Sequence, residues 1–281
     1  MEIDYNEDAL ELFWYWILER DHIRALKERG TPPEWSEDPI FQTQHFCNVR
    51  REHDRGTIEI HEAVLGANVP VEFLPYWYTI ARMFNKAQTV REALRAWNDS
   101  RHWPSMLKAL RADGHKLFHT AYVVSTCGKS MDKVDYVANV ANAVQCRNTP
   151  RFGLGRAYQE LLRVNGLGSF MAGQIVADLR NSPYLAPENK VEGKMWCVPG
   201  PGSIKGLRYI FNHFTLRGFT TYIQELYFLM PPEVRDMNIH AQDLQNCLCE
   251  FSKYMRIKNG DPGRRRPYHN VRKEDPKYVD L

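Results

Sequence analysis

The stretch Leu162-Arg163-Val164-Asn165-Gly166-Leu167-Gly168-Ser169-Phe170-Met171-Ala172 decides the predicted fold. Apolar residues at helical spacing on both sides predict two helices, and the two glycines permit a tight turn between them. Ser169 is the expected cap of the second helix. We therefore predict a helix-hairpin-helix over residues 158–179, in which Gly166, Gly168 and Ser169 contact a DNA phosphate through backbone N–H groups and a positive helix end. The alternative is an ordinary turn between two packed helices.

A second glycine-rich turn, Pro199-Gly200-Pro201-Gly202-Ser203, leads into another predicted helix. Lys205 stands near the start of that helix, where a positive charge does not suit the helix dipole. The position is better explained if the turn faces an anion, so we expect Lys205 to contact DNA. The alternative is a Pro-Gly connector whose helix is capped by Ser203.

The composition is that of a folded protein with a local, not a global, basic surface. The chain has 281 residues, 43% hydrophobic and 12% aromatic, which excludes a disordered protein. Its formal net charge of +3 limits any nucleic-acid surface to a patch. Apolar runs are too short for a membrane span and the acidic start is not a signal peptide, so we expect a cytoplasmic protein, in the host cytoplasm if a phage encodes it. The six cysteines contain no C-x-x-C pair, so no zinc site is expected.

The apolar periodicity predicts helices over almost the whole chain, and hence an all-α fold. Two stretches, Thr57–Ile60 and Ala121–Ser125, are the candidates for short strands. We expect one helical domain over residues 1–256, followed by a basic tail over residues 257–281 that contains Arg265 and Arg266. The predicted helices cover residues 9–28, 39–48, 71–84, 90–97, 103–112, 136–144, 156–164, 169–179, 204–215 and 233–254.

Three further places carry more charge than a helical array needs. The run from Asn48 to Arg55 is rich in arginine, which suits bidentate phosphate binding; the alternative is a salt-bridged helix end. The predicted helix containing Asp243, Lys253 and Tyr254 places polar groups at spacings of three and four, typical either of a functional cleft or of a salt-bridged surface helix. Asp178 lies at the C-terminal end of the second hairpin helix, where an acid opposes the dipole, so we expect an arginine partner or a catalytic task.

Several longer motifs together resemble a known family. Between about Leu12 and Tyr268 the chain is similar to the alpha-glutamyl/putrescinyl thymine pyrophosphorylase family, whose helical domain also occurs fused to phage hydroxymethyluracil DNA kinases. The motifs that carry the resemblance are Glu19-Arg20, Asp38-Pro39-Ile40, Asn48-Val49-Arg50-Arg51-Glu52 with Asp54-Arg55, Gly166-Leu167-Gly168 with Phe170-Met171-Ala172, Asp178-Leu179-Arg180, Trp196 with Gly200-Pro201-Gly202, Lys205-Gly206-Leu207, Gln245-Asn246-Cys247-Leu248-Cys249-Glu250-Phe251 with Lys253-Tyr254, and Arg265-Arg266.

The resemblance implies a fold related to helix-hairpin-helix DNA glycosylases and chemistry on a modified pyrimidine in DNA. The expected reaction displaces pyrophosphate from pyrophosphomethyluracil with an amine or amino acid, which is the co-substrate. These residues contain no G-x-x-x-x-G-K-[ST] phosphate loop, so we expect a functional partnership with a hydroxymethyluracil DNA kinase and no kinase activity of this chain itself. The stretch from Pro187 to Lys194, where a glycosylase would carry its aspartate, has only the acids Glu188 and Glu192.

The expected site combines phosphate-binding cations, acids and rings that stack on a flipped base. A DNA glycosylase that excises a modified pyrimidine, using Asp178, Glu192 or Asp243, is the alternative, and a non-catalytic module that binds modified DNA is a second. No cofactor is required, although the hairpin motif can bind a divalent cation through backbone carbonyls. The expected catalytic residues are Arg50, Arg51, Asp178, Glu192 and Asp243; the expected DNA contacts are Arg55, Gly166, Gly168, Ser169, Lys205, Lys253, Arg265 and Arg266; and the expected stacking residues are Trp196 and Tyr254.

Overall fold

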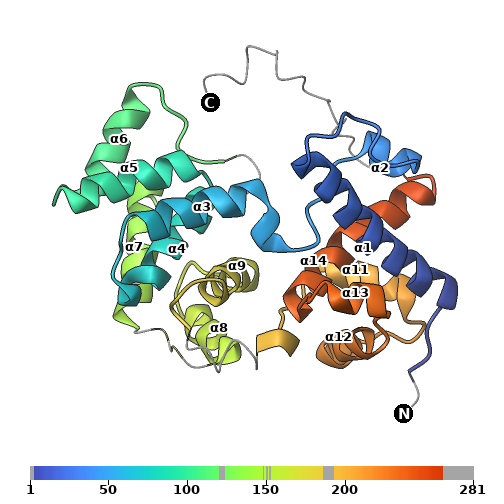
Figure 1. Ribbon diagram of the computed structural model, residues 1–281. Helices are drawn as coiled ribbons and strands as arrows, with labels where there is room; N and C mark the ends of the chain where they lie inside the picture. The colour runs from blue at the N-terminus through green and yellow to red at the C-terminus, as the bar shows by residue number, and fades with distance from the viewer. Residues whose placement is uncertain are drawn as a thin grey trace. The chain divides into compact units, whose positions relative to one another are not determined.

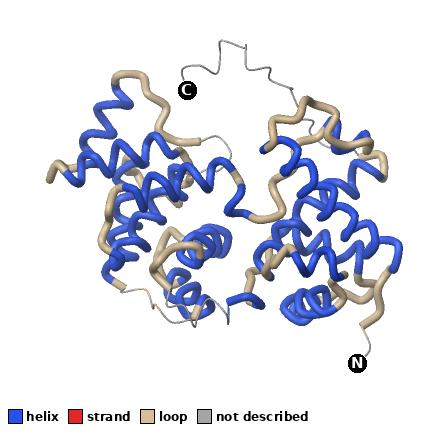
Figure 2. The backbone as a smooth tube through the Cα atoms, in the orientation of Figure 1, coloured by secondary structure: helices blue, strands red, loops and turns tan. Residues whose placement is uncertain are grey.

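The computed structural model describes residues 3–119, 124–147, 149, 151, 153–185 and 193–261. Across these ranges the chain is built of helices and loops, as Figure 2 shows, and it forms no strand. A β-bridge joins Tyr5 to Phe211. The predicted all-α fold is confirmed. Among the described helices, none combines the length and the apolar composition that crossing a membrane requires.

The chain divides into two compact units that interleave along the sequence. Unit 1 comprises Met1–Arg51, Pro199–Ile239 and Asp243–Leu281. Unit 2 comprises Glu52–Val198 and His240–Gln242. The predicted tail over residues 257–281 lies outside the described residues from position 262 onward.

Unit 2 is organised around one buried helix, α4 (Leu74–Phe84), all of whose residues are buried. Apart from Thr79 and Arg82 its residues are apolar or aromatic, which is typical of a helix surrounded by others. It contacts α3, α5, α7 and α9, so these helices enclose it (Figure 1). The other helices of unit 2 are α3 (Arg55–Gly66), α5 (Ala87–Asn98), α6 (Trp103–Ala112), α7 (Lys133–Cys146), α8 (Leu154–Leu162) and α9 (Ser169–Arg180).

Unit 1 is organised around the long first helix, α1 (Glu7–Glu28), whose N-terminus is capped by Asn6. The apolar face of α1 includes Phe13 and Trp16, both 0% exposed, and Phe13 packs against Phe251 with ring centroids 5.2 Å apart. Helix α1 contacts α11 and α13. The other elements of unit 1 are α2 (Pro39–Thr43), α11 (Pro201–Ile210), the 3-10 turn η4 (Leu216–Gly218), α12 (Phe219–Phe228), α13 (Pro232–Asp236) and, from Asp243 onward, α14 (Ala241–Lys258).

Several predicted elements differ from the structure. The helices predicted over residues 39–48 and 204–215 end earlier, at Thr43 and Ile210. Thr57–Ile60 lies within α3 and is not a strand, because Thr57 and Ile60 are buried at helical spacing on the apolar face of that helix, whereas Ile58 is exposed. Of the second predicted strand, residues 121–123 lie outside the described residues and 124–125 form loop. The helix predicted over residues 233–254 is two helices, α13 and α14, separated where Asn238 adopts a positive φ of 52°.

Gly202 of the second glycine-rich turn and Gly206 of the helix that follows it allow close helix packing inside unit 1. A Cβ atom on Gly206 would lie 2.3 Å from the backbone oxygen of Leu248, and one on Gly202 would lie 2.2 Å from the Sγ atom of Cys249. Helix α11 therefore approaches α14 closely because it has no side chain at these positions. The Ser203 Oγ atom accepts a hydrogen bond from the Gly200 N–H (3.0 Å). The structure thus gives the glycines and Ser203 the connector role that the sequence left as the alternative.

A Gly206→Ala substitution should destabilise the protein by about 1–3 kcal/mol, because the clash is with backbone and α11 has to move away from α14. Gly66→Ala is the matched control, since its Cβ meets nothing within 4 Å and α3 tolerates alanine. Urea unfolding followed by circular dichroism measures both. Equal stability of the two variants would contradict the close helix packing.

Candidate nucleic-acid interface

The predicted hairpin exists as α8, the turn over residues 163–168, and α9. The turn is closed by backbone hydrogen bonds from Val164 N–H to the Leu161 oxygen (3.0 Å) and from Leu167 N–H to the Val164 oxygen (3.1 Å). Leu167 is 6% exposed and packs into the core of unit 2, so the turn is anchored between its two glycines.

The two glycines of this turn have different physical reasons to be glycine. Gly166 has a φ of +104°, and a Cβ atom there would lie 2.6 Å from the hydroxyl oxygen of Tyr136. The fold itself therefore requires glycine at 166. Gly168 has an ordinary φ of −83°, is exposed, and a Cβ atom on it would meet nothing within 4 Å. No neighbouring atom of the described chain requires glycine at 168, although the residue is the N-cap of α9, a position that glycine favours.

The N-terminus of α9 follows Gly168 directly. Gly168 is the N-cap, and its oxygen accepts the first helical hydrogen bond, from Ala172 N–H (3.0 Å). Ser169 was the expected cap, but it is the first helical residue and no side-chain capping bond is formed. Ser169 is exposed and Phe170 is 51% exposed, so the first turn of α9 faces solvent with its amide groups.

Asp178, at the other end of α9, lies in a buried polar network. Its carboxylate accepts hydrogen bonds from Nε and Nη2 of Arg82, both at 2.5 Å, and from Nε2 of His61 at 3.3 Å. Asp178 is 1% exposed and Arg82 3%. Arg82 also donates to the Thr57 hydroxyl (3.3 Å), so the network joins α3, α4 and α9. The structure supplies the arginine partner that the sequence indicated for Asp178.

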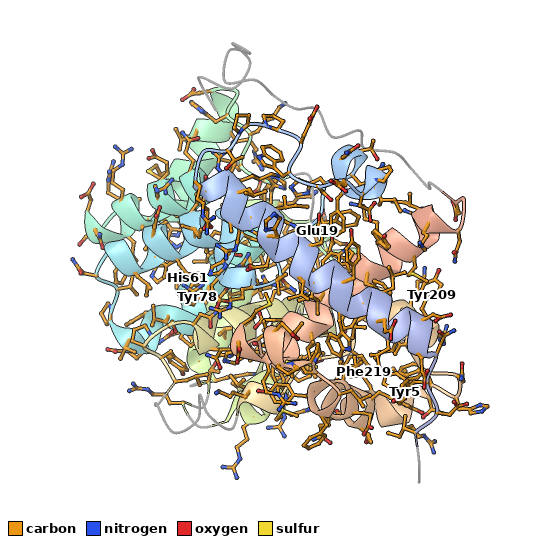
Figure 3. The ribbon with its side chains drawn as sticks, turned by 45° about the vertical axis from the view of Figure 1, so that its right-hand side comes forward. Tyr5, Glu19, His61, Tyr78, Tyr209 and Phe219 are labelled. Carbon is orange, nitrogen blue, oxygen red and sulfur yellow. The ribbon has the colours of Figure 1, made fainter. Side chains whose placement is uncertain are left out.

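Tyr78 completes this network from α4. Its hydroxyl lies 3.1 Å from Nδ1 of His61, and the two side chains are labelled next to each other in Figure 3. Burial raises the pKa of Tyr78, and the Asp178 carboxylate raises it further, so the hydroxyl keeps its proton. Because a carboxylate only accepts, His61 donates from Nε2 to Asp178, and in the neutral ring Nδ1 accepts from Tyr78.

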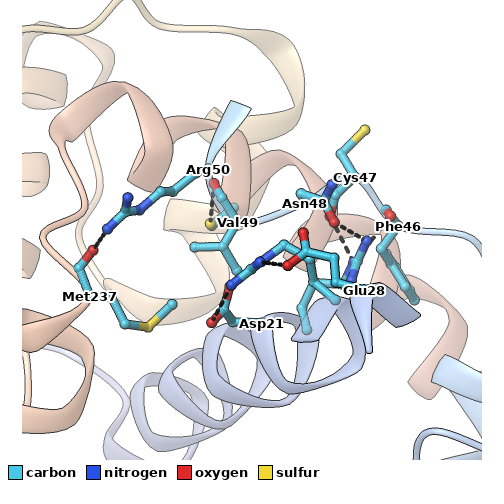
Figure 4. A network of polar contacts seen from close by, with 11 residues as sticks. Asp21, Glu28, Phe46, Cys47, Asn48, Val49, Arg50 and Met237 are labelled. Atoms are coloured by element: carbon cyan, nitrogen blue, oxygen red, sulfur yellow. Dashed lines mark hydrogen bonds and ion pairs between the residues drawn. The ribbon is translucent and has the colours of Figure 1, made fainter. Parts of the chain in front are cut away.

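In unit 1, the segment Phe46–Arg50 is held in place by several polar contacts, drawn in Figure 4. Arg20 of α1 donates from Nε to the backbone oxygens of Phe46 (3.2 Å) and Cys47 (3.0 Å), and from Nη2 to the side-chain oxygen of Asn48. Arg50 donates to the backbone oxygen of Met237. The segment that carries the expected phosphate-binding Arg50 is therefore preorganised.

Helix α14 fixes the same segment from its polar face. Asn246 donates to the backbone oxygen of Asn48 (3.1 Å), and Glu250 accepts from the backbone N–H of Cys47 (3.2 Å). The polar residues that the sequence assigned to a cleft or a charged surface thus bind backbone groups of the segment Phe46–Arg50. In the described structure Asn246 and Glu250 therefore position that segment.

Lys253 and Tyr254 of α14 have different surroundings. Lys253 donates to the backbone oxygen of His45 and lies 4.6 Å from the ring centroid of Phe46. Tyr254 is 3% exposed, its ring lies among aromatic side chains, and its hydroxyl donates to Asp38 (2.7 Å). No face of this ring is open to a nucleobase in the described structure. Asp243 is 2% exposed.

The other expected contact residues lie on exposed or half-exposed positions. Arg51 is half-buried at the start of the 3-10 turn η1 (Arg51–His53). The side chain of Arg55 is 89% exposed and pairs with Glu59 at 2.7 Å. Trp196 is half-buried with its ring 5.6 Å from that of Tyr158, and Lys205 is exposed on α11. Glu192, Arg265 and Arg266 lie outside the described residues.

Unit 1 contains a pocket that no sequence-based expectation included. This pocket has a volume of about 290 Å³ and is lined by residues of α1, the loop before α2, α2 itself and the chain that follows. We call it the aromatic pocket; its lining residues are Arg20, Ile23, Lys27, Pro33, Glu34, Trp35, Ser36, Phe41, Gln42, Gln44, His45 and Phe46. Little in the sequence around Trp35 indicates this pocket, because the charged neighbours of Trp35 are acids, and only the fold brings Trp35 against Arg20 and Lys27.

These features define an all-α protein with a solvent-facing hairpin tip and a braced, arginine-bearing segment. Residues 7–263 match the family model described as 5-hmdU DNA kinase, helical domain, and the chain belongs to this family. It is 22% identical over 319 aligned residues to the 5-hmdU DNA kinase of Bacillus phage SP10, which covers 96% of this chain and 50% of that relative. The chain thus spans about half the length of the curated relative. No solved structure matches it.

An Asp178→Asn substitution should lower the free energy of unfolding by about 3 kcal/mol or more, because it leaves the Arg82 charge buried without its partner. Glu92→Gln is the matched control: it makes the same change of carboxylate to amide in the exposed pair with Arg95 (2.6 Å), whose loss costs at most about 1 kcal/mol. Urea unfolding measures both. A cost for Asp178→Asn no larger than that of the control would refute a structural role of the buried pair.

Proposed function

We propose that this chain acts in thymine hypermodification of DNA: it displaces pyrophosphate from pyrophosphomethyluracil in the polymer with an amine or amino acid. Membership in the helical-domain family of 5-hmdU DNA kinase carries this proposal, because it links the chain to a modified thymine in DNA. The relative's name describes a kinase of that base in DNA, and the proposed reaction uses a base activated by phosphorylation. A kinase for the same base is therefore the expected functional partner.

DNA binding is assigned to the tip of the hairpin. The exposed first turn of α9 directs backbone N–H groups and the positive end of the helix toward solvent, which suits a phosphate oxygen. Gly168 supports the assignment, since its missing side chain leaves room for a phosphate to approach and no neighbouring atom of the described chain requires glycine there. Contacts of this kind hold the DNA backbone and do not select its sequence.

The leaving pyrophosphate is assigned to Arg50 and Arg51. In the proposed step the bond between the C5 methylene carbon and the pyrophosphate oxygen breaks, and the oxygen keeps the electron pair. A bond forms between that carbon and the amine nitrogen, which then loses one proton. Cationic side chains held in place before the reaction stabilise the charge that develops on the leaving oxygen. The braced segment Phe46–Arg50 supports this role, because it fixes the backbone from which Arg50 extends.

The acids contribute less to the proposal than the arginines. Asp178 is engaged by Arg82 and His61 and buried, so its described surroundings are those of a structural residue. Asp243 stays an expected proton acceptor for the amine. A glycosylase also needs an acid near the sugar, and this makes base excision the outcome to test against, together with binding without chemistry.

Gly168→Ala should weaken binding to a DNA duplex about tenfold, roughly the value of one hydrogen bond to a charged group, without lowering the melting temperature. The loss should be equal for duplexes of unrelated sequence. Gly166→Ala is the matched control, because its Cβ clashes inside the fold and the melting temperature should fall. Fluorescence anisotropy and thermal unfolding measure the two effects. Unchanged DNA affinity of folded Gly168→Ala would exclude a phosphate contact at the hairpin tip.

The reaction is tested by nucleoside mass spectrometry of DNA that contains pyrophosphomethyluracil, after incubation with the protein and a mixture of amines. We expect an aminated thymidine and released pyrophosphate. Arg50→Ala should reduce turnover at least about a hundredfold, the usual loss for one preorganised group that stabilises a developing negative charge. Arg151→Ala is the control variant, since Arg151 also donates to a backbone oxygen, that of Tyr184 (3.0 Å), and belongs to unit 2.

Each alternative gives a different product in the same experiment. A free base with alkali-labile strand breaks would identify a glycosylase. DNA that is bound but chemically unchanged with every amine tested would favour a non-catalytic module that binds modified DNA. Full activity of Arg50→Ala would remove this arginine from the mechanism.

A further inference from the structure

The aromatic pocket of unit 1 has no part in the proposed binding of DNA at the hairpin tip or of pyrophosphate at Arg50 and Arg51. Three aromatic side chains contribute to its wall: Trp35 is half-buried, and Phe41 and Phe46 are buried. The indole of Trp35 is oriented by a hydrogen bond from its Nε1 to the backbone oxygen of Thr31 (2.7 Å). An oriented aromatic wall suits a flat ring, because stacking tolerates any base. The volume of about 290 Å³ lies at the lower end for small-ligand sites and suits a single base rather than a larger cofactor.

The charges on the pocket wall favour an anionic ligand. Arg20 and Lys27 are its strong cations, and Glu34 is the carboxylate among its lining residues. The Nζ atom of Lys27 lies over the Trp35 ring, 4.3 Å from its centre, so the cation contacts one face of the indole. Burial lowers the pKa of His45, and the charges of Lys253, Arg20 and Lys27 lower it further. Two cations therefore line the pocket, and a phosphate near Lys27 or Arg20 would be stabilised by their charge.

Arg20 connects the pocket to the braced segment. The same guanidinium that lines the pocket donates to the backbone of Phe46 and Cys47 and to Asn48, two residues before Arg50. Phe46, the first residue of this segment, also lines the pocket, so a ligand there would contact the segment that carries Arg50. The pocket and Arg50, to which the leaving pyrophosphate is assigned, are therefore connected through the segment Phe46–Arg50.

We propose that the aromatic pocket binds a pyrimidine that carries a phosphate group, with the ring against Trp35 and Phe41 and the phosphate at Lys27 and Arg20. The assignment of this ligand to the reaction rests on the proposed function, whereas its binding does not. Such a pyrimidine comes from two sources, a base turned out of a DNA strand or a free nucleoside. The shared recognition is an aromatic face for the ring and cations for the phosphate.

The test is calorimetric titration of the full chain with two nucleosides that differ by one phosphate, 5-phosphomethyl-2′-deoxyuridine and 5-hydroxymethyl-2′-deoxyuridine. A single-stranded oligonucleotide that contains either base once forms the second arm. The phosphate should improve affinity about tenfold, in keeping with one hydrogen bond to a charged group. Binding of the free nucleosides identifies a nucleoside site, and binding of the oligonucleotide alone identifies a base within a strand.

Two variants locate the binding in the pocket. Lys27→Gln should remove most of the advantage of the phosphate while the unphosphorylated ligand binds as before. Trp35→Ala should weaken both ligands at least about fivefold, and Trp35→Phe, which keeps an aromatic face, should bind like the native chain. Lys258→Gln and Phe228→Ala are the controls, because they remove an exposed lysine and an aromatic ring that is 74% exposed in the same unit, away from the pocket lining.

The proposal is overturned if neither nucleoside nor oligonucleotide binds at millimolar concentration, or if Lys27→Gln and Trp35→Ala behave like the controls. Because affinity is measured without turnover, these results are separate from those of the reaction assay. Pocket binding with no aminated product would support the binding site and refute the proposed transferase function. Aminated product without pocket binding would support the transferase function and refute the binding site.

Discussion

The buried ion pair between Arg82 and Asp178 is the interaction on which the hairpin depends. Helix α4 is buried along its whole length, and Arg82 places a full positive charge in that apolar surrounding. The charge is tolerated because the Asp178 carboxylate binds it through two hydrogen bonds, with Thr57 on the same guanidinium. Since Asp178 is in the last turn of α9, the pair attaches that helix to the centre of unit 2. The exposed first turn of α9 is thereby presented on a rigid support.

A comparable arrangement stabilises the segment Phe46–Arg50 in unit 1. Arg20 binds three successive residues through backbone oxygens and the Asn48 side chain, and α14 contributes Asn246 and Glu250 from another direction. Chain without regular secondary structure has to satisfy its polar backbone groups, and here long side chains from two helices do so. The result is a loop that holds Arg50 with little conformational freedom, which is what a preorganised charge-stabilising group requires.

The glycine-rich turns show how one kind of motif has two physical origins. Gly202 and Gly206 allow α11 to approach α14, and Gly166 allows the hairpin turn to pass Tyr136 at positive φ. In each of these cases the neighbouring atoms account for the missing side chain. Gly168 has open space and an ordinary backbone conformation, so no contact with a neighbouring atom accounts for its missing side chain. The pattern Gly-x-Gly is the same in the sequence, and the distinction appears only when the neighbours are known.

The sequence by itself determined the all-α fold, most helix positions and the hairpin, because these follow from local periodicity and from glycine spacing. It also indicated that Asp178 needed a partner, but the partner, Arg82, lies 96 residues away. Only the tertiary structure decided that Tyr254 is covered, that the polar face of α14 braces another segment, and that Thr57–Ile60 is helical. The aromatic pocket likewise forms only when the loop around Trp35 meets Lys27 and Arg20 of α1. Local spacing does not encode which distant residues meet, since burial and pairing are set by packing across the whole unit.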